Sequence, residues 1–389
     1  MKYMGHKGRL LPTLGQVLLE VGRDSENAAD PFCGSGVVSW FLAENTGLVV
    51  HAGDLQRFAS VRAAAVIERT ASIEAPALLT CWFAAARERI DRVIDHFPNA
   101  MRSINPDLDD PGEIREVVER SRRFSGVVLP PLLDQIGGQW PISKAYGGYY
   151  FSPVQALVLD ALRQTLPRRV RERDTALSAL IEAASRCAAA PGHTAQPFQP
   201  TIGAACYIVE AWSRDVWARV ADAVNALVGR FARRAGTATA RDFRATLENM
   251  RPGDLVFADP PYSDVHYSRF YHVLETLTRG QEVAVFGQGR YPPAAERPAS
   301  EFSRRSEAKR SAAELIEICA QSRLNLVLTF PVGKAKNGLS SKDFIEYGRS
   351  RFSAVDYLEE DSKFSTLGGN AIARSARIRC AEAVVTFRP

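Results

Sequence analysis

The segment from Asp254 to Tyr262 constrains the fold more than any other part of the chain. It reads Asp-Leu-Val-Phe-Ala-Asp-Pro-Pro-Tyr, a short apolar run that ends in an acid, two prolines and an aromatic ring. The run predicts a buried parallel strand, because it is short, apolar and preceded by the turn pair Pro252-Gly253. The strand must end at Pro260, since proline has no N–H group for a neighbouring strand.

The residues after this strand suggest a binding site for a planar molecule. The consecutive prolines Pro260 and Pro261 restrict the backbone, so the Asp259 carboxylate, the Pro260 carbonyl and the Tyr262 ring are expected on one wall of a cleft. Two hydrogen-bond acceptors beside a flat ring suit a substrate with an exocyclic amine. The alternative interpretation is a structural, proline-rich turn.

A second signal lies between Ala28 and Glu44. A short strand is predicted to end at Asp30, and the turn Gly34-Ser35-Gly36 and an apolar helix follow. Glycines let the backbone approach a ligand closely, beside the N-terminus of the helix. An acid at the strand end favours an ammonium group over a phosphate. A dinucleotide-binding loop would need a third glycine at the position of Ser39.

The next predicted strand runs from Leu48 to Asp54. An acid about 20 residues after a glycine turn is the usual place for a ribose contact. Capping of the following helix is the alternative role for Asp54. Further strands are predicted at 324–330, 354–358 and 381–387, the last two as a hairpin connected through residues 367–370.

The middle of the chain, from about Thr70 to Gly236, has a different pattern. Helical stretches alternate there with glycine-aromatic loops, and no strand–helix alternation is evident. The arginines between 163 and 173 form either a solvated face or a phosphate-contacting face. The residues Tyr149, Tyr150 and Phe151 favour a core role over stacking on bases. Residues 287–309, which hold Arg304, Arg305 and Lys309, are predicted to form a mobile loop.

Composition limits the functional classes. The 389 residues suit two domains, and the net charge of +5 is compatible with a nucleic-acid partner. Six scattered cysteines without a C-x-x-C pair indicate a reducing compartment and argue against a cysteine zinc site. His266 and His272 are six residues apart, off a shared helical face, so no metal site is expected. No apolar run reaches about 18 residues, so a cytoplasmic protein without a membrane span is expected.

The flanking parts alternate strand and helix, which predicts an α/β fold with a doubly wound, mostly parallel, Rossmann-like sheet and an inserted, mainly helical domain. The predicted domains are 1–69 with 237–389, and 70–236. Asp30, Asp54 and Asp259 all fall at the carboxyl ends of predicted strands, where ligands bind in such sheets.

These motifs, in this order, resemble the DNA adenine N6-methyltransferases that use S-adenosylmethionine. The resemblance covers roughly residues 1–60 and 240–389: Lys-Tyr-x-Gly-x-Lys at the start, Asp-Pro-Phe-x-Gly-x-Gly from Asp30, and Asp-Pro-Pro-Tyr from Asp259. The order is similar to the group that places its target-recognition domain between the cofactor motif and the catalytic motif. Residue 3 is Tyr, where many relatives carry Trp.

The resemblance implies roles for these residues. It places Lys7 near the cofactor carboxylate, Asp30 at the methionine ammonium and Asp54 at the ribose hydroxyls. The other implied cofactor-binding residues are Tyr3, Phe32, Gly34, Gly36 and Asp242, the last of these near the adenine amine.

The implied reaction is methylation of a flipped-out adenine in double-stranded DNA. Asp259 and the Pro260 carbonyl would accept the two N6 hydrogens, Pro261 would stiffen the turn, and Tyr262 would stack on the base. No metal or covalent nucleophile is required.

The inserted domain would read the DNA sequence, through residues such as Trp140, Tyr149, Arg168 and Arg169. A restriction or defence system is the implied partner. The alternatives are an RNA adenine or protein glutamine methyltransferase, and a DNA-binding protein on a catalytically decayed fold.

Overall fold

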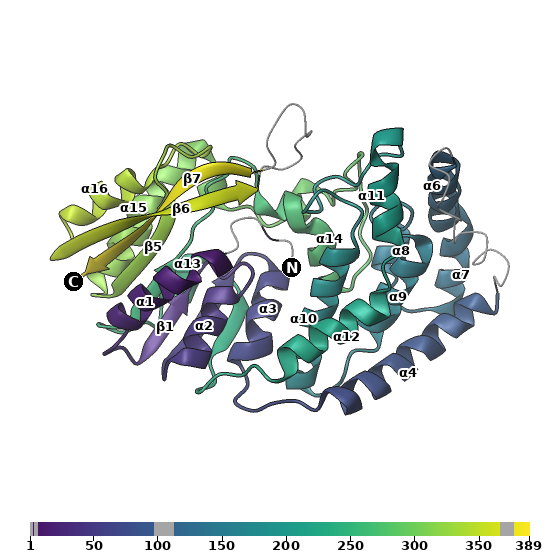
Figure 1. Ribbon diagram of the computed structural model, residues 1–389, viewed down its shortest axis with the longest axis horizontal. Helices are drawn as coiled ribbons and strands as arrows, with labels where there is room; N and C mark the ends of the chain where they lie inside the picture. Colours follow the sequence, from purple (N-terminus) through teal and green to yellow (C-terminus); the bar gives the residue numbers. More distant parts are fainter. Residues whose placement is uncertain (1–2, 4–6, 97–112, 366–376) are drawn as a thin grey trace. The chain divides into compact units, whose positions relative to one another are not determined.

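The computed structural model describes residues 3, 7–96, 113–365 and 377–389. The chain divides into two compact units, coloured along the sequence in Figure 1. We call residues 73–229 with 269–297 the helical unit, and residues 3–72, 230–268 and 298–389 the sheet unit. The helical unit thus holds a segment, 269–297, that follows the Asp-Pro-Pro-Tyr motif. A role for residues 70–236 in target recognition stays a prediction.

Within the described residues, seven strands form one sheet in the order β3-β2-β1-β4-β5-β7-β6. The first five strands in this order are parallel, whereas β7 runs antiparallel to both β5 and β6. The predicted doubly wound, mostly parallel sheet and the predicted terminal strand pair are confirmed; the predicted connection at 367–370 lies outside the described residues. The strands are β1 (Asn27–Asp30), β2 (Val49–Asp54), β3 (Thr237–Ala240), β4 (Leu255–Ala258), β5 (Asn325–Pro331), β6 (Ala354–Ser365) and β7 (Arg377–Arg388).

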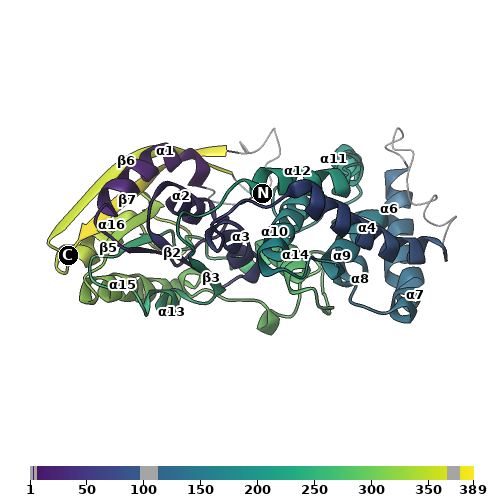
Figure 2. The same ribbon diagram turned by 90° about the horizontal axis from the view of Figure 1, so that it is seen from below.

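Helices cover both faces of this sheet, as Figure 2 shows. One face carries α1 (Leu11–Val21), α2 (Val37–Asn45) and α3 (Arg57–Ile67). The other carries α13 (Phe243–Leu247), α15 (Arg305–Gln321) and α16 (Ser341–Arg349). On this second face Val256 and Leu328 of the sheet pack in one buried cluster with Leu315 and Phe344 of the helices. The short helices η1 (Lys7–Arg9) and η4 (Glu301–Ser303) complete the unit.

The strand order reverses between β1 and β4. At such a switch point the connections leave to opposite faces and open a crevice at the carboxyl ends of the strands. Asp30 ends β1, Asp54 ends β2 and Asp259 follows β4 directly. The sheet therefore brings the three predicted acids to its ligand-binding edge.

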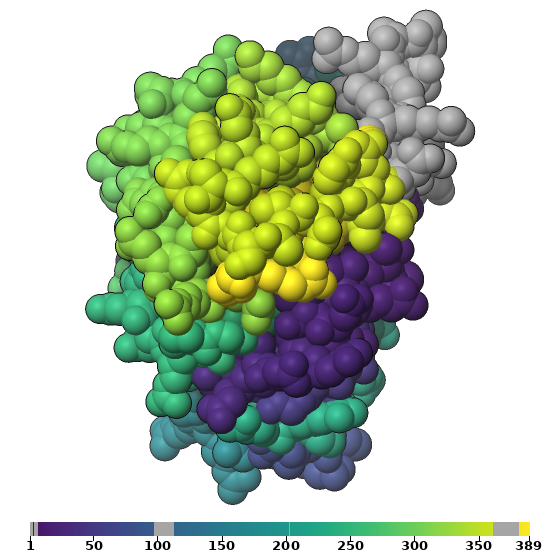
Figure 3. Space-filling view, turned by 90° about the vertical axis from the view of Figure 1, so that its left-hand side faces the viewer, coloured from purple at the N-terminus to yellow at the C-terminus, as the bar shows by residue number. Residues whose placement is uncertain are grey.

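Helix α1, near the start of the chain, and strand β7, near its end, lie side by side in the sheet unit. Figure 3 shows the purple N-terminal segment beside the yellow C-terminal strands. Arg388 of β7 pairs with Glu20 of α1 at 3.2 Å and with Asp356 of β6 at 2.8 Å. Such exposed pairs contribute little stability by themselves, about 0–1 kcal/mol, but they mark the register of the hairpin against α1.

The structure corrects the predicted loop at 287–309, because α15 begins at Arg305. Ala308, Ala312 and Leu315 recur at helical spacing and are fully buried, so this segment gains a packed apolar face. Arg305 pairs with Asp264 at 3.3 Å and Arg304 with Glu307 at 3.2 Å. The positive charges expected to meet phosphates are therefore already partly compensated.

The helical unit contains α4 (Ala75–Ile94), α6 (Ile114–Arg123), η2 (Phe124–Val128), α7 (Leu129–Ile136), α8 (Pro141–Tyr146), α9 (Pro153–Gln164), α10 (Val170–Cys187), α11 (Ile202–Trp212), α12 (Val216–Val228), most of α14 (Tyr267–Arg279) and η3 (Ala294–Glu296). Of the three residues for which a core role was favoured, Tyr150 and Phe151 are fully buried, whereas Tyr149 is only half-buried. Trp140 is also fully buried, so its ring cannot contact DNA in this structure. No helix in the described ranges is long and apolar enough to cross a membrane.

Candidate active site

A pocket lies at the carboxyl edge of the sheet and is lined by residues of the sheet unit alone. It encloses about 1180 Å³, including the part that is open to solvent. All residues predicted for the site line the pocket except Gly36 and Pro260.

Asp30 is the most deeply buried acid of the pocket, with 1% of its surface exposed. Its Oδ2 accepts a hydrogen bond of 2.6 Å from the Ser39 hydroxyl, whereas its Oδ1 accepts none from any described residue. Burial, with the negative charges of Asp259 and Asp54, raises the pKa of Asp30 to about 7. A buried carboxylate oxygen without a partner is a site for a cationic or hydrogen-bond-donating ligand group.

The glycine turn shapes the wall beside Asp30. Gly34 has φ +48°, and a Cβ there would lie 2.6 Å from the Tyr3 hydroxyl, so this position excludes a side chain. Gly36 has φ +81° and precedes α2; a Cβ there would contact Trp40 and the backbone of Ala63 instead of the pocket. Gly36 therefore serves the backbone conformation, and its predicted role at the cofactor stays a prediction.

Asp54 connects two backbone segments. Its Oδ2 accepts from the Gly34 N–H at 3.0 Å, and its Oδ1 accepts from the Gln56 N–H at 2.8 Å. The side chain thus braces the glycine turn and the start of α3 while it lines the pocket. The bond to the Gln56 N–H lies at the start of α3, and the ribose contact implied for Asp54 stays a prediction.

Three phenylalanine rings form an apolar wall. The ring centroid of Phe32 lies 5.9 Å from that of Phe243, in a stacked arrangement, and 5.4 Å from that of Phe302, edge to face. The centroids of Phe243 and Phe302 are 5.7 Å apart. An aromatic wall of this kind suits a flat heterocycle.

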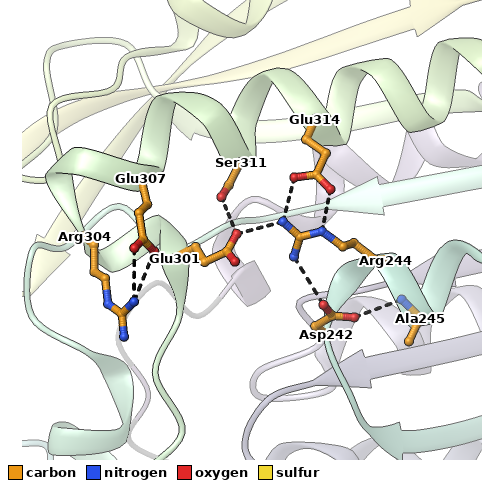
Figure 4. A network of polar contacts seen from close by, with 8 residues as sticks. All are labelled: Asp242, Arg244, Ala245, Glu301, Arg304, Glu307, Ser311 and Glu314. Atoms are coloured by element: carbon orange, nitrogen blue, oxygen red, sulfur yellow. Dashed lines mark hydrogen bonds and ion pairs between the residues drawn. The ribbon is translucent and has the colours of Figure 1, made fainter.

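A network of charges supports this wall, as Figure 4 shows. Asp242 caps α13 by accepting from the Ala245 N–H at 2.9 Å, and its second oxygen accepts from Arg244 at 3.2 Å. Arg244 also forms a two-pronged pair with Glu314, at 2.5 and 2.6 Å, and binds Glu301 at 2.8 Å. These bonds tie α13, which carries Phe243, to η4, which carries Phe302, and to α15.

Lys7 joins two acids at the catalytic motif. Its ammonium lies 3.0 Å from Oδ1 of Asp259 and pairs with Glu382 of β7. The Thr329 hydroxyl also donates to Oδ1 of Asp259, at 3.0 Å. Burial and the charge of Glu382 raise the pKa of Asp259, against the opposing effect of Lys7. Both of these contacts, with Lys7 and with Thr329, are made through Oδ1 of Asp259.

The proline turn is fixed by Asn337, which is 1% exposed. Its amide donates to the Pro261 carbonyl and to the Phe302 carbonyl, both at 3.0 Å. The Tyr262 ring lines the pocket edge-on to Tyr267, with centroids 6.5 Å apart. Pro260 is buried outside the pocket lining, so the predicted use of its carbonyl stays a prediction.

The charge of the pocket favours a cation. Of its described lining residues, five are acidic (Asp30, Asp54, Asp242, Asp259 and Glu301) and two are basic (Lys7 and Arg244). A phosphate-bearing cofactor would meet repulsion from this lining, whereas an ammonium or sulfonium group would be attracted. No group of three or more His, Cys or acidic side chains suited to a metal ion occurs among the described residues.

Several residues of the site escape prediction from the sequence. Ser39, Thr329 and Asn337 act through side chains that only the packed sheet brings to the pocket. Glu382 offered one signal, an acid within the apolar run Ala381–Phe387. A buried acid in such a run requires a cationic partner, and Lys7 is that partner.

Residues 213–327 match the family model of the D12 class N6 adenine-specific DNA methyltransferases. The matched range includes the Asp-Pro-Pro-Tyr motif and reaches from α12 into β5. No curated protein sequence matches the chain. The family match indicates an enzyme that methylates adenine in DNA.

Proposed function

We propose that this DNA adenine methyltransferase uses S-adenosylmethionine to methylate N6 of an adenine that leaves the DNA duplex. The cofactor supplies an electrophilic methyl group on its sulfonium. The single observation that carries the proposal is the placement of two acids at the switch point: Asp30, whose buried Oδ1 has no hydrogen-bond partner among the described residues, and Asp259, whose Oδ1 is held by Lys7 and Thr329.

The pocket fits this cofactor by its chemistry. Oδ1 of Asp30 suits the methionine ammonium, because a buried carboxylate pairs best with a charged donor. Asp54, at the end of β2, remains able to accept from ribose hydroxyls. The wall of Phe32, Phe243 and Phe302 offers an apolar surface to a purine ring. The excess of acids attracts the sulfonium charge.

Asp259 is the proposed acceptor for the adenine amine. The nitrogen lone pair of this amine is delocalised into the ring, so the enzyme must orient it. Lys7 and Thr329 hold Oδ1, and Oδ2 accepts an N6 hydrogen. Tyr262, whose turn is pinned by Asn337, provides the face on which the extruded base stacks. Positioning of this kind accounts for most of the expected rate enhancement.

The test is a methylation assay with the full chain, labelled S-adenosylmethionine and separate pools of duplex DNA, RNA and protein. Mass spectrometry of the digested DNA should find N6-methyladenine as the modified base. N4-methylcytosine, or label only in RNA or in protein glutamine, would overturn the assignment. Cofactor binding without turnover on every pool would favour a decayed enzyme.

Two substitutions make the assay specific to the site. Asp259→Asn should abolish methylation and retain cofactor binding, measured by calorimetry. Asp254→Asn is the matched control, because Asp254 is a buried acid at the opposite end of β4 that accepts from Asn27 and Arg251. Equal loss of activity in both variants would point to folding instead of chemistry.

A further inference from the structure

We infer that two stacks of arginine and tyrosine in the helical unit bind the phosphate backbone of duplex DNA. In the first stack, the guanidinium groups of Arg122 and Arg290 each lie over the ring of Tyr149, 4.5 Å from its centroid. The inference rests on the proposed function for its partner, DNA. It assigns that contact to residues that neither the catalytic motif nor the pocket includes.

The second stack is adjacent in sequence to the first. The ring of Tyr291 has Arg269 at 4.9 Å and Arg297 at 5.6 Å from its centroid. Its hydroxyl donates to the Ala195 carbonyl, which fixes the ring. Four arginines are therefore gathered around two tyrosines within one unit of the chain.

None of these four arginines has a carboxylate within ion-pair distance among the described residues. Most neighbouring surface arginines differ: Arg115 pairs with Glu119 at 3.1 Å and Arg169 with Glu172 at 3.3 Å. Burial lowers the pKa of Arg122; the nearby charges of Tyr149 and Glu119 raise it, and that of Arg290 lowers it. Clustered positive charge without ion-pair partners is typical of a surface that binds a polyanion.

The guanidinium groups are oriented before any ligand binds. Each donates its Nε hydrogen to a fixed acceptor, which leaves the two terminal nitrogens for an anion. Planar groups held in this way match the two oxygens of a phosphate. The Nε bonds are Arg122 to Gly148 O (3.2 Å), Arg290 to Ala145 O (2.8 Å), Arg269 to Tyr291 Oη (3.1 Å) and Arg297 to Pro292 O (3.1 Å).

The turn at 286–291 that carries Arg290 and Tyr291 is rigid. The Gly289 carbonyl accepts from the Tyr150 hydroxyl at 2.9 Å and interacts with His272 Nε2 at 3.0 Å. Arg290 itself has φ +53°, a strained conformation for a side chain other than glycine. A strained backbone conformation that neighbouring hydrogen bonds hold in place is often found at functional positions.

The same turn exposes an aromatic ring. Phe286 bridges to Tyr291 through the backbone, and 62% of its surface is exposed. An isolated phosphate would gain nothing from an apolar ring, whereas a nucleic acid presents sugars and base faces beside its phosphates. The combination therefore favours DNA over small anions.

The test measures the salt dependence of binding to a fluorescein-labelled duplex DNA by anisotropy, with the full chain. The variant R122Q/R269Q/R290Q/R297Q removes the four unpaired charges. The matched control R92Q/R115Q/R120Q/R219Q removes four charges that are paired with acids in the same unit. The first variant should flatten the slope of log K against log salt by up to about 3.6, at about 0.9 per phosphate contact, and the control by far less.

Cofactor binding by calorimetry reports whether each variant is folded. A second variant, with lysines at the four positions, keeps the charge but loses the planar fork and the Nε bonds. It should keep most of the salt slope and bind DNA several-fold more weakly than the parent. Lysines that restore full affinity would overturn the argument from orientation.

The outcomes separate this inference from the proposed function. A parent that methylates DNA while the glutamine variant keeps the parent slope would refute the inference alone. The opposite outcome is a parent chain that methylates no DNA, together with a salt slope that is flatter in the glutamine variant but not in the control. That outcome would refute the proposed function and support the inferred DNA-binding surface.

Discussion

The raised pKa of Asp30 makes cofactor affinity depend on pH. Burial raises this pKa from the ordinary 3.8 to about 7, so the carboxyl group is protonated over much of the acidic range. A cationic ligand group binds the ionised form. Binding below pH 7 must therefore displace a proton, and the apparent dissociation constant should rise tenfold for each pH unit below about 7.

The expected magnitude is about 100-fold between pH 8 and pH 5, since each unit of pKa shift corresponds to a tenfold change in equilibrium. The effect on folding has the opposite sign. A raised carboxyl pKa stabilises the fold below 3.8, and this contribution is lost as pH rises through about 7. The whole shift amounts to about 4 kcal/mol in the free energy of unfolding.

Calorimetric titration with S-adenosylmethionine from pH 5 to 8, in two buffers of different ionisation enthalpy, measures both affinity and proton release. Asp30→Asn removes the titrating group. It should therefore weaken cofactor binding at pH 8 and abolish the fall in affinity between pH 7 and pH 5. Asp254→Asn should keep the fall in affinity at acidic pH. A parent affinity that stays constant from pH 5 to 8, or a fall in affinity that persists in Asp30→Asn, would refute the reasoning.

Three further changes probe the site. Glu382→Gln removes a charge that raises the pKa of Asp259, so the acidic limb of the kcat–pH profile should move to lower pH; an unmoved profile would show that Glu382 does not act through Asp259. Gly34→Ala should weaken cofactor binding, because its Cβ would displace Tyr3, whereas Gly253→Ala, at φ +87° in open space, should cost only stability, about 1–2 kcal/mol. Equal affinities in these two variants would contradict the packing argument. Arg244→Lys loses the two-pronged bond to Glu314 and should lower cofactor affinity without lowering kcat at saturation; a fall in kcat alone would contradict a supporting role.

Local patterns were sufficient to predict six of the seven strands described and the ligand edge of the sheet. Proline cannot continue a strand, and a short apolar run before it has few alternatives, so the end of β4 at Asp259 followed from the sequence. The same holds for the acids that end β1 and β2. These residues depend on backbone chemistry within a few positions of each other, which a single sequence displays.

Contacts between distant segments needed the tertiary structure. Lys7 and Glu382 are separated by 375 residues, and only the pairing of β7 with β5 brings that acid to the catalytic motif. The edge strand β3 reads Thr-Ala-Thr-Ala and is mostly exposed, so it lacked the apolar signal of a buried strand.

The arginine–tyrosine stacks of the helical unit also depend on contacts between distant segments. The sequence displayed many arginines there, but not which of them have acidic partners. That difference arises because Arg122, Arg269, Arg290 and Arg297 come from three separate segments that converge on two rings. Whether an arginine is paired with an acid depends on the distance between the two charges, and the distances between separate segments are set only when the chain folds.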